Sequence, residues 1–165
     1  MHHQNRFLQA LLPPMLLMLS FGAHALSSDK DQPIELAADS VDVDEGRGTS
    51  VYKGNVDLRQ GSMRLLADTV TVKQQDRQPN RIIAVGSVRF TQKNTEGQMV
   101  KARAKKAEYT VNSEILELTG KASLTQGGDT MKSDRIVYDR VKHTVRAGAA
   151  AQGKQRVRIT IEPPK

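Results

Sequence analysis

A short pattern repeats three times along the chain, and it restricts the fold more than any other feature of the sequence. Each copy begins with glycine, carries apolar residues at the third and fifth places, and has glutamine at the seventh. The copies begin at Gly54, Gly86 and Gly120, which are 32 and 34 residues apart. A fixed period in this range is typical of stacked supersecondary units. Because the alternation inside each copy has a period of two, it predicts a β-strand with one buried face.

A second element recurs between these copies, with a small residue first and apolar residues at the fourth and usually the sixth place. Its four copies begin at Ala38, Ala67, Ala104 and Ser133. Turn signals lie between the two elements, and no stretch has a helical period long enough to compete with the strand pattern. The two elements together predict an all-β fold of short, stacked antiparallel strands.

The alternation also predicts which side chains share one interior. The run 81–85 is apolar on both faces, so alternation does not fix its parity, and we expect Ile82 and Ala84 to point inward. Polar residues of the opposite parity, such as Arg64 and Arg89, are expected to face water. The expected interior contains Val56, Leu58, Met63, Leu65, Val70, Val72, Val88, Phe90, Tyr109, Val111, Leu116, Leu118, Leu124, Ile136 and Tyr138.

The first 25 residues are typical of a cleaved export signal. A short polar start ends at Arg6, an apolar stretch follows over residues 7–21, and an A-x-A cleavage site ends at Ala25. The alternative is a retained membrane anchor, but polar residues and a proline pair interrupt the stretch, which is shorter than the ~20 apolar residues of a spanning helix. We therefore predict that residues 1–25 are a signal peptide and that residues 26–165 form one exported domain.

The charge of the exported part favours an anionic partner. Arg6 is the only basic residue of the signal segment, so 24 Lys and Arg remain against 18 Asp and Glu, a net charge of about +6. A phosphorylated glycolipid or anionic lipid suits this compartment better than nucleic acid, because the exported part has four aromatic residues and no tryptophan for base stacking. A positive charge that serves only solubility is the alternative.

No constellation of residues predicts catalysis or a metal centre. Asp42, Asp44 and Glu45 precede Gly46 without the spacing of a calcium loop. His143 is the one histidine after the signal segment, and it has no H-E-x-x-H context. The chain has no cysteine, which excludes disulfides and thiol chemistry. We therefore expect no enzyme activity, no catalytic residues, no cofactor and no metal.

Four short motifs between Asp31 and Ile161 keep a fixed order along the chain: Asp31-Gln32-Pro33-Ile34-Glu35-Leu36, Gly54-Asn55-Val56 with Gln60-Gly61, Ala67-Asp68 and Leu118-Thr119-Gly120. Their order and spacing resemble those of the LptA (OstA-like) family of lipopolysaccharide-transport proteins. The fold implied by this resemblance is an elongated, slightly twisted, open jellyroll of antiparallel strands, folded over an apolar groove that is open at both ends. The implied function is to carry lipopolysaccharide across the periplasm from an inner-membrane extractor to an outer-membrane translocon.

The resemblance further implies that interior side chains line a groove for the lipid A acyl chains. The alternative is that the same side chains fill a closed core. Two other classes of protein fit the repeats: a structural β-solenoid that links envelope proteins without carrying lipid, and an LptC-like anchor that keeps its N-terminal segment. The expected groove residues are Ile34, Leu36, Val56, Leu58, Leu65, Phe90, Tyr109, Val111 and Leu118.

An open jellyroll leaves the backbone groups of its first and last strands unpaired, which suits both strands to strand addition. We expect the first strand at Ile34–Val43 and the last at Val157–Ile161, with two prolines ending the ladder. In the family these edges join copies head to tail and contact an LptC-like inner-membrane anchor and the N-terminal domain of an LptD-like translocon. Ordinary capping of the sheet is the alternative. The expected edge residues are Ile34, Leu36, Val157, Ile159 and Ile161.

A basic stripe is expected on the outer face of one strand. Lys101, Arg103 and Lys105 alternate with small or apolar residues, so their side chains should all point outward. Such a stripe can contact phosphate or acidic sugars. A solvated strand face is the alternative.

Overall fold

The computed structural model describes residues 29–94 and 96–163. They form one ten-stranded sheet and two short 3-10 helices. The expected signal peptide, residues 1–25, lies outside the described residues. The elements are η1 (Asp29–Asp31), β1 (Glu35–Ala37), β2 (Ser40–Asp44), β3 (Thr49–Gln60), β4 (Met63–Gln75), β5 (Gln78–Lys93), β6 (Met99–Thr110), β7 (Ile115–Gln126), β8 (Asp129–Asp139), β9 (Thr144–Ala147), η2 (Gly148–Ala151) and β10 (Arg158–Thr160).

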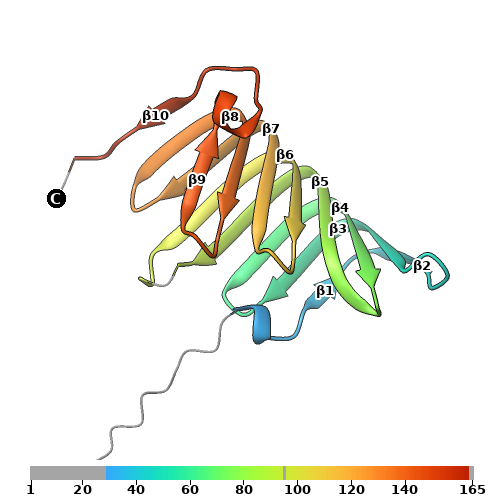
Figure 1. Cartoon of the computed structure of the whole chain (residues 1–165). Helices are drawn as coiled ribbons and strands as arrows, with labels where there is room; N and C mark the ends of the chain where they lie inside the picture. The colour runs from blue at the N-terminus through green and yellow to red at the C-terminus, as the bar shows by residue number, and fades with distance from the viewer. Residues whose placement is uncertain (1–28, 95, 164–165) are drawn as a thin grey trace, which may run out of the picture.

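The sheet is antiparallel and follows chain order. Its order is β1-β3-β4-β5-β6-β7-β8-β10, with β2 also paired to β3 and β9 also paired to β8. Figure 1 shows the strands stacked along the molecule, with β1 and β2 at one end and β9 and β10 at the other. The predicted all-β, elongated and open jellyroll is therefore confirmed.

The strands of the stack are longer than predicted because each joins two predicted strands through a bend. Strands β3 to β8 contain 11 to 16 residues, and the pairing shifts register near the middle of β3 to β7. In β3, β5 and β7 the bend lies at the repeat glycines Gly54, Gly86 and Gly120, whose φ angles are 79°, 81° and 79°. Glycine adopts this left-handed conformation without steric cost.

The aligned bends double the sheet over into two layers, termed the first arm and the second arm. The register of each strand pair assigns every segment to one arm. The first arm contains β2, residues 49–53, 69–75, 78–85, 106–110, 115–119 and 135–139, and β9; the second arm contains β1, residues 56–60, 63–67, 88–93, 99–104, 122–126 and 129–133, and β10.

The expected first strand is wrong in one respect, because Ile34–Val43 contains two strands rather than one. Strand β1 pairs with the second arm of β3, and β2 pairs with its first arm. The chain changes arms at Asp39, whose N–H donates to the Gly54 carbonyl at 3.0 Å. The Asp39 carboxylate accepts a hydrogen bond from Asn55 at 2.9 Å. The first strand therefore bends along the same line as the others, while β10 confirms the expected last strand to within one residue at each end.

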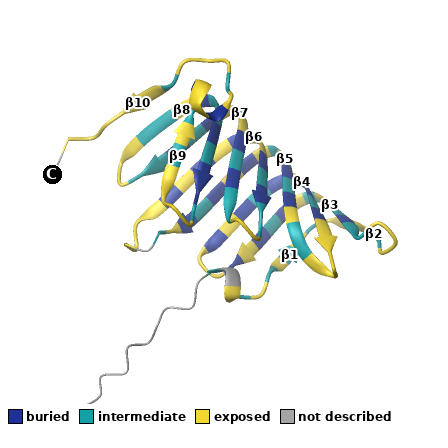
Figure 2. Ribbon diagram, viewed as in Figure 1, coloured by how far each residue is buried: buried dark blue, intermediate teal, exposed yellow. Residues whose placement is uncertain are grey.

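The core lies between the two arms, as the alternation predicted. Figure 2 shows buried and exposed residues alternating along the long strands. All the expected interior residues are buried except Val111, which is partly buried against the same cluster. Ile82 and Ala84 are 2% and 0% exposed, so their expected inward parity is confirmed, whereas Val85 is 49% exposed.

Substitution of Gly86 by alanine is expected to lower the free energy of unfolding by about 3 kcal/mol, which urea denaturation would measure. Alanine at a positive φ costs about 1–2 kcal/mol, and its Cβ would overlap the Asp68 carboxylate, which adds the cost of overpacking. Gly97 is the matched control, because its φ is 77° and nothing lies within 4 Å of a Cβ there. Gly97→Ala should cost about 1 kcal/mol, and equal losses in the two variants would contradict the role of the Asp68 contact.

Candidate functional site

The candidate site is the apolar interior between the two arms. Six of the nine expected groove residues are buried there, and none of the six is more than 5% exposed. The other three are partly buried and pack against the same cluster. The structure therefore brings all nine together: Val56, Leu58, Leu65, Phe90, Tyr109 and Leu118 in the buried set, and Ile34, Leu36 and Val111 at its border.

The interior is filled by its own side chains when the arms hold this position. A cavity of about 10 Å³ remains between them, at the lower limit for one water molecule. The expected open groove is therefore closed at this point, because apolar side chains of the facing arms meet and their burial is favourable. The cavity is lined by Leu58, Met63, Leu65 and Phe90 of the second arm and by Ile82, Ala107, Tyr109 and Leu116 of the first.

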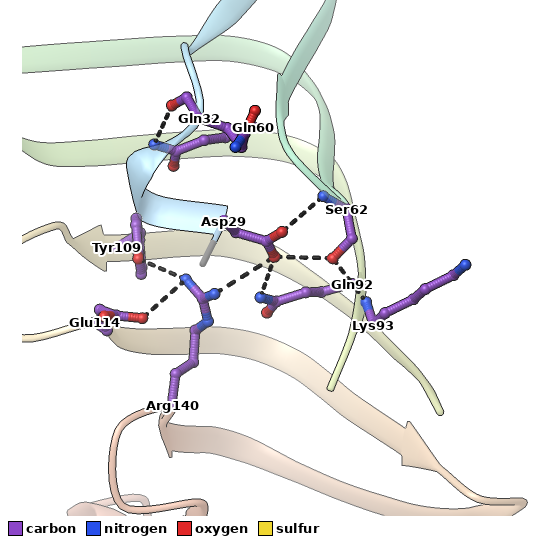
Figure 3. A network of polar contacts seen from close by, with 9 residues as sticks. All are labelled: Asp29, Gln32, Gln60, Ser62, Gln92, Lys93, Tyr109, Glu114 and Arg140. Atoms are coloured by element: carbon purple, nitrogen blue, oxygen red, sulfur yellow. Dashed lines mark hydrogen bonds and ion pairs between the residues drawn. The ribbon is translucent and has the colours of Figure 1, made fainter. Parts of the chain in front are cut away.

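A polar network closes the mouth, where the free ends of the two arms approach each other (Figure 3). The Asp29 carboxylate accepts hydrogen bonds from the Ser62 N–H at 2.8 Å, the Ser62 hydroxyl at 2.8 Å and the Gln92 amide at 2.6 Å. It also forms an ion pair with Arg140 at 3.6 Å. Gln92 belongs to the second arm and Ser62 lies in the turn that joins the second-arm segments of β3 and β4, whereas Arg140 follows the first-arm end of β8. Residues 29–33, termed the strap, therefore join the two arms.

Arg140 holds the first-arm side of this network. Its guanidinium donates to the Tyr109 hydroxyl at 2.6 Å and lies 5.6 Å from the centroid of the Tyr109 ring. A second carboxylate, that of Glu114, lies 3.6 Å from Arg140. Burial raises the pKa of the Tyr109 phenol, although the charge of Arg140 opposes this. The Arg140 side chain is 9% exposed, so its charge is compensated by two carboxylates in a place with little water.

Sequence reasoning missed the network, although the repeat glutamines carried a usable signal. Gln60 and Gln92 have the inward parity of their apolar neighbours, and both are 5% exposed. The Gln60 amide donates to the Gln32 carbonyl of the strap at 3.1 Å, as Gln92 does to Asp29. A polar group at an inward position requires a partner, but the repeat does not identify that partner. Asp29 and Arg140 lie outside the repeats and gave no signal.

The apolar interior reaches the solvent at both ends of the stack. Val41 and Val43 of β2 have the inward parity and are 51% and 61% exposed. These two edge residues were not among those expected, although they alternate with acidic residues. At the opposite end, β10 places Ile159 beside Met131, and Ile159 is 57% exposed. The expected edge residues lie at these two ends, Ile34 and Leu36 at the first and Val157, Ile159 and Ile161 at the second.

The expected basic stripe lies on the outer face of β6, with Lys101 and Arg103 on the second arm and Lys105 at the bend. Lys101, Arg103 and Lys105 are exposed on β6 and alternate with buried residues. Their outward direction is confirmed. Because they are on the outer face, these side chains are separated by the sheet from anything held between the arms.

Neither a metal cluster nor a spanning helix occurs in residues 29–94 and 96–163. No three His, Asp or Glu side chains gather closely enough there to hold a metal ion. No helix within the same ranges has the length and apolar character needed to cross a membrane.

The family described as "LptA/(LptD N-terminal domain) LPS transport protein" matches residues 35–144. The chain belongs to this family. The lipopolysaccharide export system protein LptH of Pseudomonas aeruginosa is 32% identical over 151 residues, which are 87% of this chain and 86% of LptH. The lipopolysaccharide export system protein LptA of Escherichia coli K12 is 30% identical over 134 residues, 79% of this chain and 72% of LptA.

A solved structure confirms that the open jellyroll is shared within the LptA/LptD N-terminal domain family. The crystal structure of Pseudomonas aeruginosa LptH, titled the LptA homologous periplasmic component of the lipopolysaccharide transport device, matches with a TM-score of 0.75. The match covers 82% of this chain and 99% of the LptH chain at 32% identity. The resemblance inferred from the repeats is therefore confirmed.

Proposed function

We propose that this chain is a periplasmic carrier of lipopolysaccharide that holds the lipid A acyl chains between its two arms. The observation that carries the proposal is the continuous apolar interior, which ends in exposed apolar residues at both ends of the stack. The relatives LptH and LptA are lipopolysaccharide export proteins, which favours carriage over a purely structural solenoid. The proposed function involves no covalent step, no enzyme activity and no cofactor.

The energetic need for such a carrier follows from the chemistry of the lipid. An acyl chain costs about 0.8 kcal/mol per CH₂ group exposed to water, so a twelve-carbon chain would cost on the order of 10 kcal/mol. Contact with Leu58, Phe90 and Leu118 would replace that exposure. Because the acyl chain takes the place of contacts between the arms, the apolar surface of both remains buried in the loaded carrier.

Loading requires the arms to separate, and the strap is where we propose that separation begins. Within the strap, the Asp29 carboxylate contacts Gln92 and Arg140, and the Gln32 carbonyl accepts a hydrogen bond from Gln60. When these contacts break, the mouth is open to an acyl chain entering from the side. The buried residues near the cavity would then become the lining of the groove.

Photo-crosslinking tests carriage directly. A photoreactive residue at Phe90, which is 2% exposed, should form adducts with lipopolysaccharide in cells. The matched control is Val85 on the same strand, whose side chain points outward and is 49% exposed. Adducts at position 90 and not at 85 are expected. A chain that assembles normally without adducts at position 90 would support the scaffold instead.

We further propose that the carrier works as one part of a bridge. In this proposal residues 1–25 direct export and are removed, and residues 26–165 are a single domain. The two sheet edges then pair with further copies head to tail, with an LptC-like anchor and with the N-terminal domain of an LptD-like translocon. The family description, which groups LptA with the LptD N-terminal domain, supports pairing between similar folds. Exposed edge strands with apolar side chains are suited to it.

Substitution of Val43 by aspartate is expected to weaken edge pairing at least tenfold, about 1.4 kcal/mol in association free energy. The change places a charge among the apolar residues that a second sheet would cover, and Val43 is 61% exposed. Analytical ultracentrifugation would measure the association. Val85→Asp is the control, because Val85 is 49% exposed but lies in the middle of the stack. A charge at that position should not alter the association. Equal weakening by both variants would argue against pairing at this edge.

A further inference from the structure

A basic hollow lies on the outer face of the second arm, beside the segment that leads into β10. Its volume is about 790 Å³, which is within the range of small-molecule sites. A second hollow of about 380 Å³ shares Arg103 and Lys121 with it and adds Arg89 and Lys105. Neither lining contains an acidic residue. The cations that line the larger hollow are Arg103, Lys121, Lys132, Arg156 and Arg158.

The sheet register places four of these cations in one row across neighbouring strands. Arg89 lies directly opposite Arg103, Ser123 separates Arg103 from Lys132, and Lys132 lies opposite Arg158. Like charges directly opposite each other destabilise a sheet. The row therefore carries an electrostatic cost that the fold itself does not require.

These cations also lack the acidic partners that other cations of the sheet have. Arg59 and Arg64 both pair with Asp57, at 2.9 and 2.8 Å, and Arg135 pairs with Glu117 at 2.9 Å. Within the part of the chain that the structure describes, no ion pair is formed by Arg89, Arg103, Lys121, Lys132, Arg156 or Arg158. Their charge is thus available to a ligand.

The wall of the hollow is held in place by backbone hydrogen bonds. The Asp134 carboxylate accepts from the Lys154 N–H at 2.6 Å, and the Gly148 N–H donates to the Ser133 hydroxyl at 3.1 Å. The hydrogen bond from the Lys154 N–H, helped by the backbone N–H of Gln155, holds the pKa of Asp134 below its usual range. The segment between η2 and β10 is therefore fixed over the strands before any ligand arrives, which reduces the entropic cost of binding.

We infer that this hollow is a binding site for a ligand that carries phosphate groups. Arginine binds phosphate through two parallel N–H donors. The row contains one arginine from each of β5, β6 and β10 and a lysine, Lys132, from β8. Cations distributed over 790 Å³ suit a ligand with more than one phosphate better than a single ion. The site includes Arg103 of the expected stripe and lies outside the interior, so it does not depend on the proposed carriage of acyl chains. Phosphate of this kind occurs in anionic membrane lipids and in free phosphorylated compounds.

A titration with inorganic pyrophosphate, followed by amide NMR shifts of the whole mature chain, tests the site. Saturable shifts are expected at Ser123, Lys132 and Val157. The variant Arg103→Gln, Lys132→Gln, Arg158→Gln should weaken binding at least tenfold. The control Lys73→Gln, Arg77→Gln, Arg146→Gln removes the same charge from exposed positions elsewhere and should leave binding within twofold. Absence of saturable shifts, or equal weakening by both variants, would overturn the inference.

Vesicle sedimentation separates the two sources of phosphate. If a lipid headgroup is the ligand, the chain should sediment with phosphatidylglycerol vesicles and not with phosphatidylcholine vesicles, and the first variant should lose this property while the control keeps it. Pyrophosphate binding without sedimentation would instead identify a free phosphorylated ligand. Crosslinking at Phe90 in the first variant shows whether interior loading is unaffected, so failure of the outer site is distinguishable from failure of the carrier function.

Discussion

Substitution of Asp29 by alanine is expected to raise the initial rate of lipopolysaccharide uptake about tenfold. Asp29 joins the two arms only when the mouth is closed, through the contacts to Ser62, Gln92 and Arg140. Loss of hydrogen bonds worth about 1.4 kcal/mol in total shifts the equilibrium between closed and open mouths by a factor of ten. Arg140 keeps Glu114 as a partner in this variant, so the fold should lose little stability.

Uptake of a fluorescently labelled lipopolysaccharide would measure the rate. Glu35→Ala is the control, because it removes the same charge from an exposed position in β1, close to the strap in sequence. The control should take up lipid at the rate of the unmodified chain. A folded Asp29→Ala protein with an unchanged rate would show that the strap does not limit opening.

Substitution of Arg140 by methionine is expected to lower the free energy of unfolding by about 3 kcal/mol near pH 7. This loss of stability is larger than that expected for Asp29→Ala. Methionine fills similar space without charge, so the variant leaves the carboxylates of Asp29 and Glu114 without their shared cation. Their side chains are 15% and 16% exposed, which prevents water from compensating fully. The Tyr109 hydroxyl loses its donor as well.

A second substitution identifies the cause of that loss. Glu114→Gln in the Arg140→Met background removes the charge of one carboxylate that has lost Arg140, so the double variant should be more stable than Arg140→Met alone. Denaturant titrations of both variants would measure this. Arg146→Met changes an exposed residue of β9 and should cost less than about 0.5 kcal/mol. A double variant no more stable than Arg140→Met would indicate that packing, rather than charge, is responsible.

The interior was predictable because one face of each long strand, β3 to β8, is buried over most of its length. A period-two pattern then assigns residues such as Val56 and Leu58 directly. The bends could not be predicted in the same way, because the repeat pattern fits Gly54 and Gly86 at the start of a short strand as well as in the middle of a long one. The pairing with neighbouring strands decides between these two positions, and the paired residues are far apart in the sequence. The division of the first strand at Asp39 has the same origin.

The contacts at the mouth of the site could not be predicted from the sequence, for a different reason. Alternation reports burial, and it marked Gln60 and Gln92 as inward residues without naming their partners. The contact between Asp29 and Arg140 joins residues that are 111 positions apart in the sequence, and no local pattern encodes a contact of that range. The closed state of the interior was equally hidden, because the same apolar residues can meet each other or surround an acyl chain.

The line of bends has a mechanical consequence. Every ladder of backbone hydrogen bonds runs between neighbouring strands within one arm, so rotation of one arm away from the other about the glycines breaks none of them. Gly54, Gly86 and Gly120 place a residue of wide conformational freedom at the bend of β3, β5 and β7, so this line of bends can serve as a hinge. Opening breaks the hydrogen bonds of the strap and the side-chain contacts between the arms. An acyl chain can replace the apolar contacts, and each arm keeps its own hydrogen-bond ladders while the volume between the arms changes.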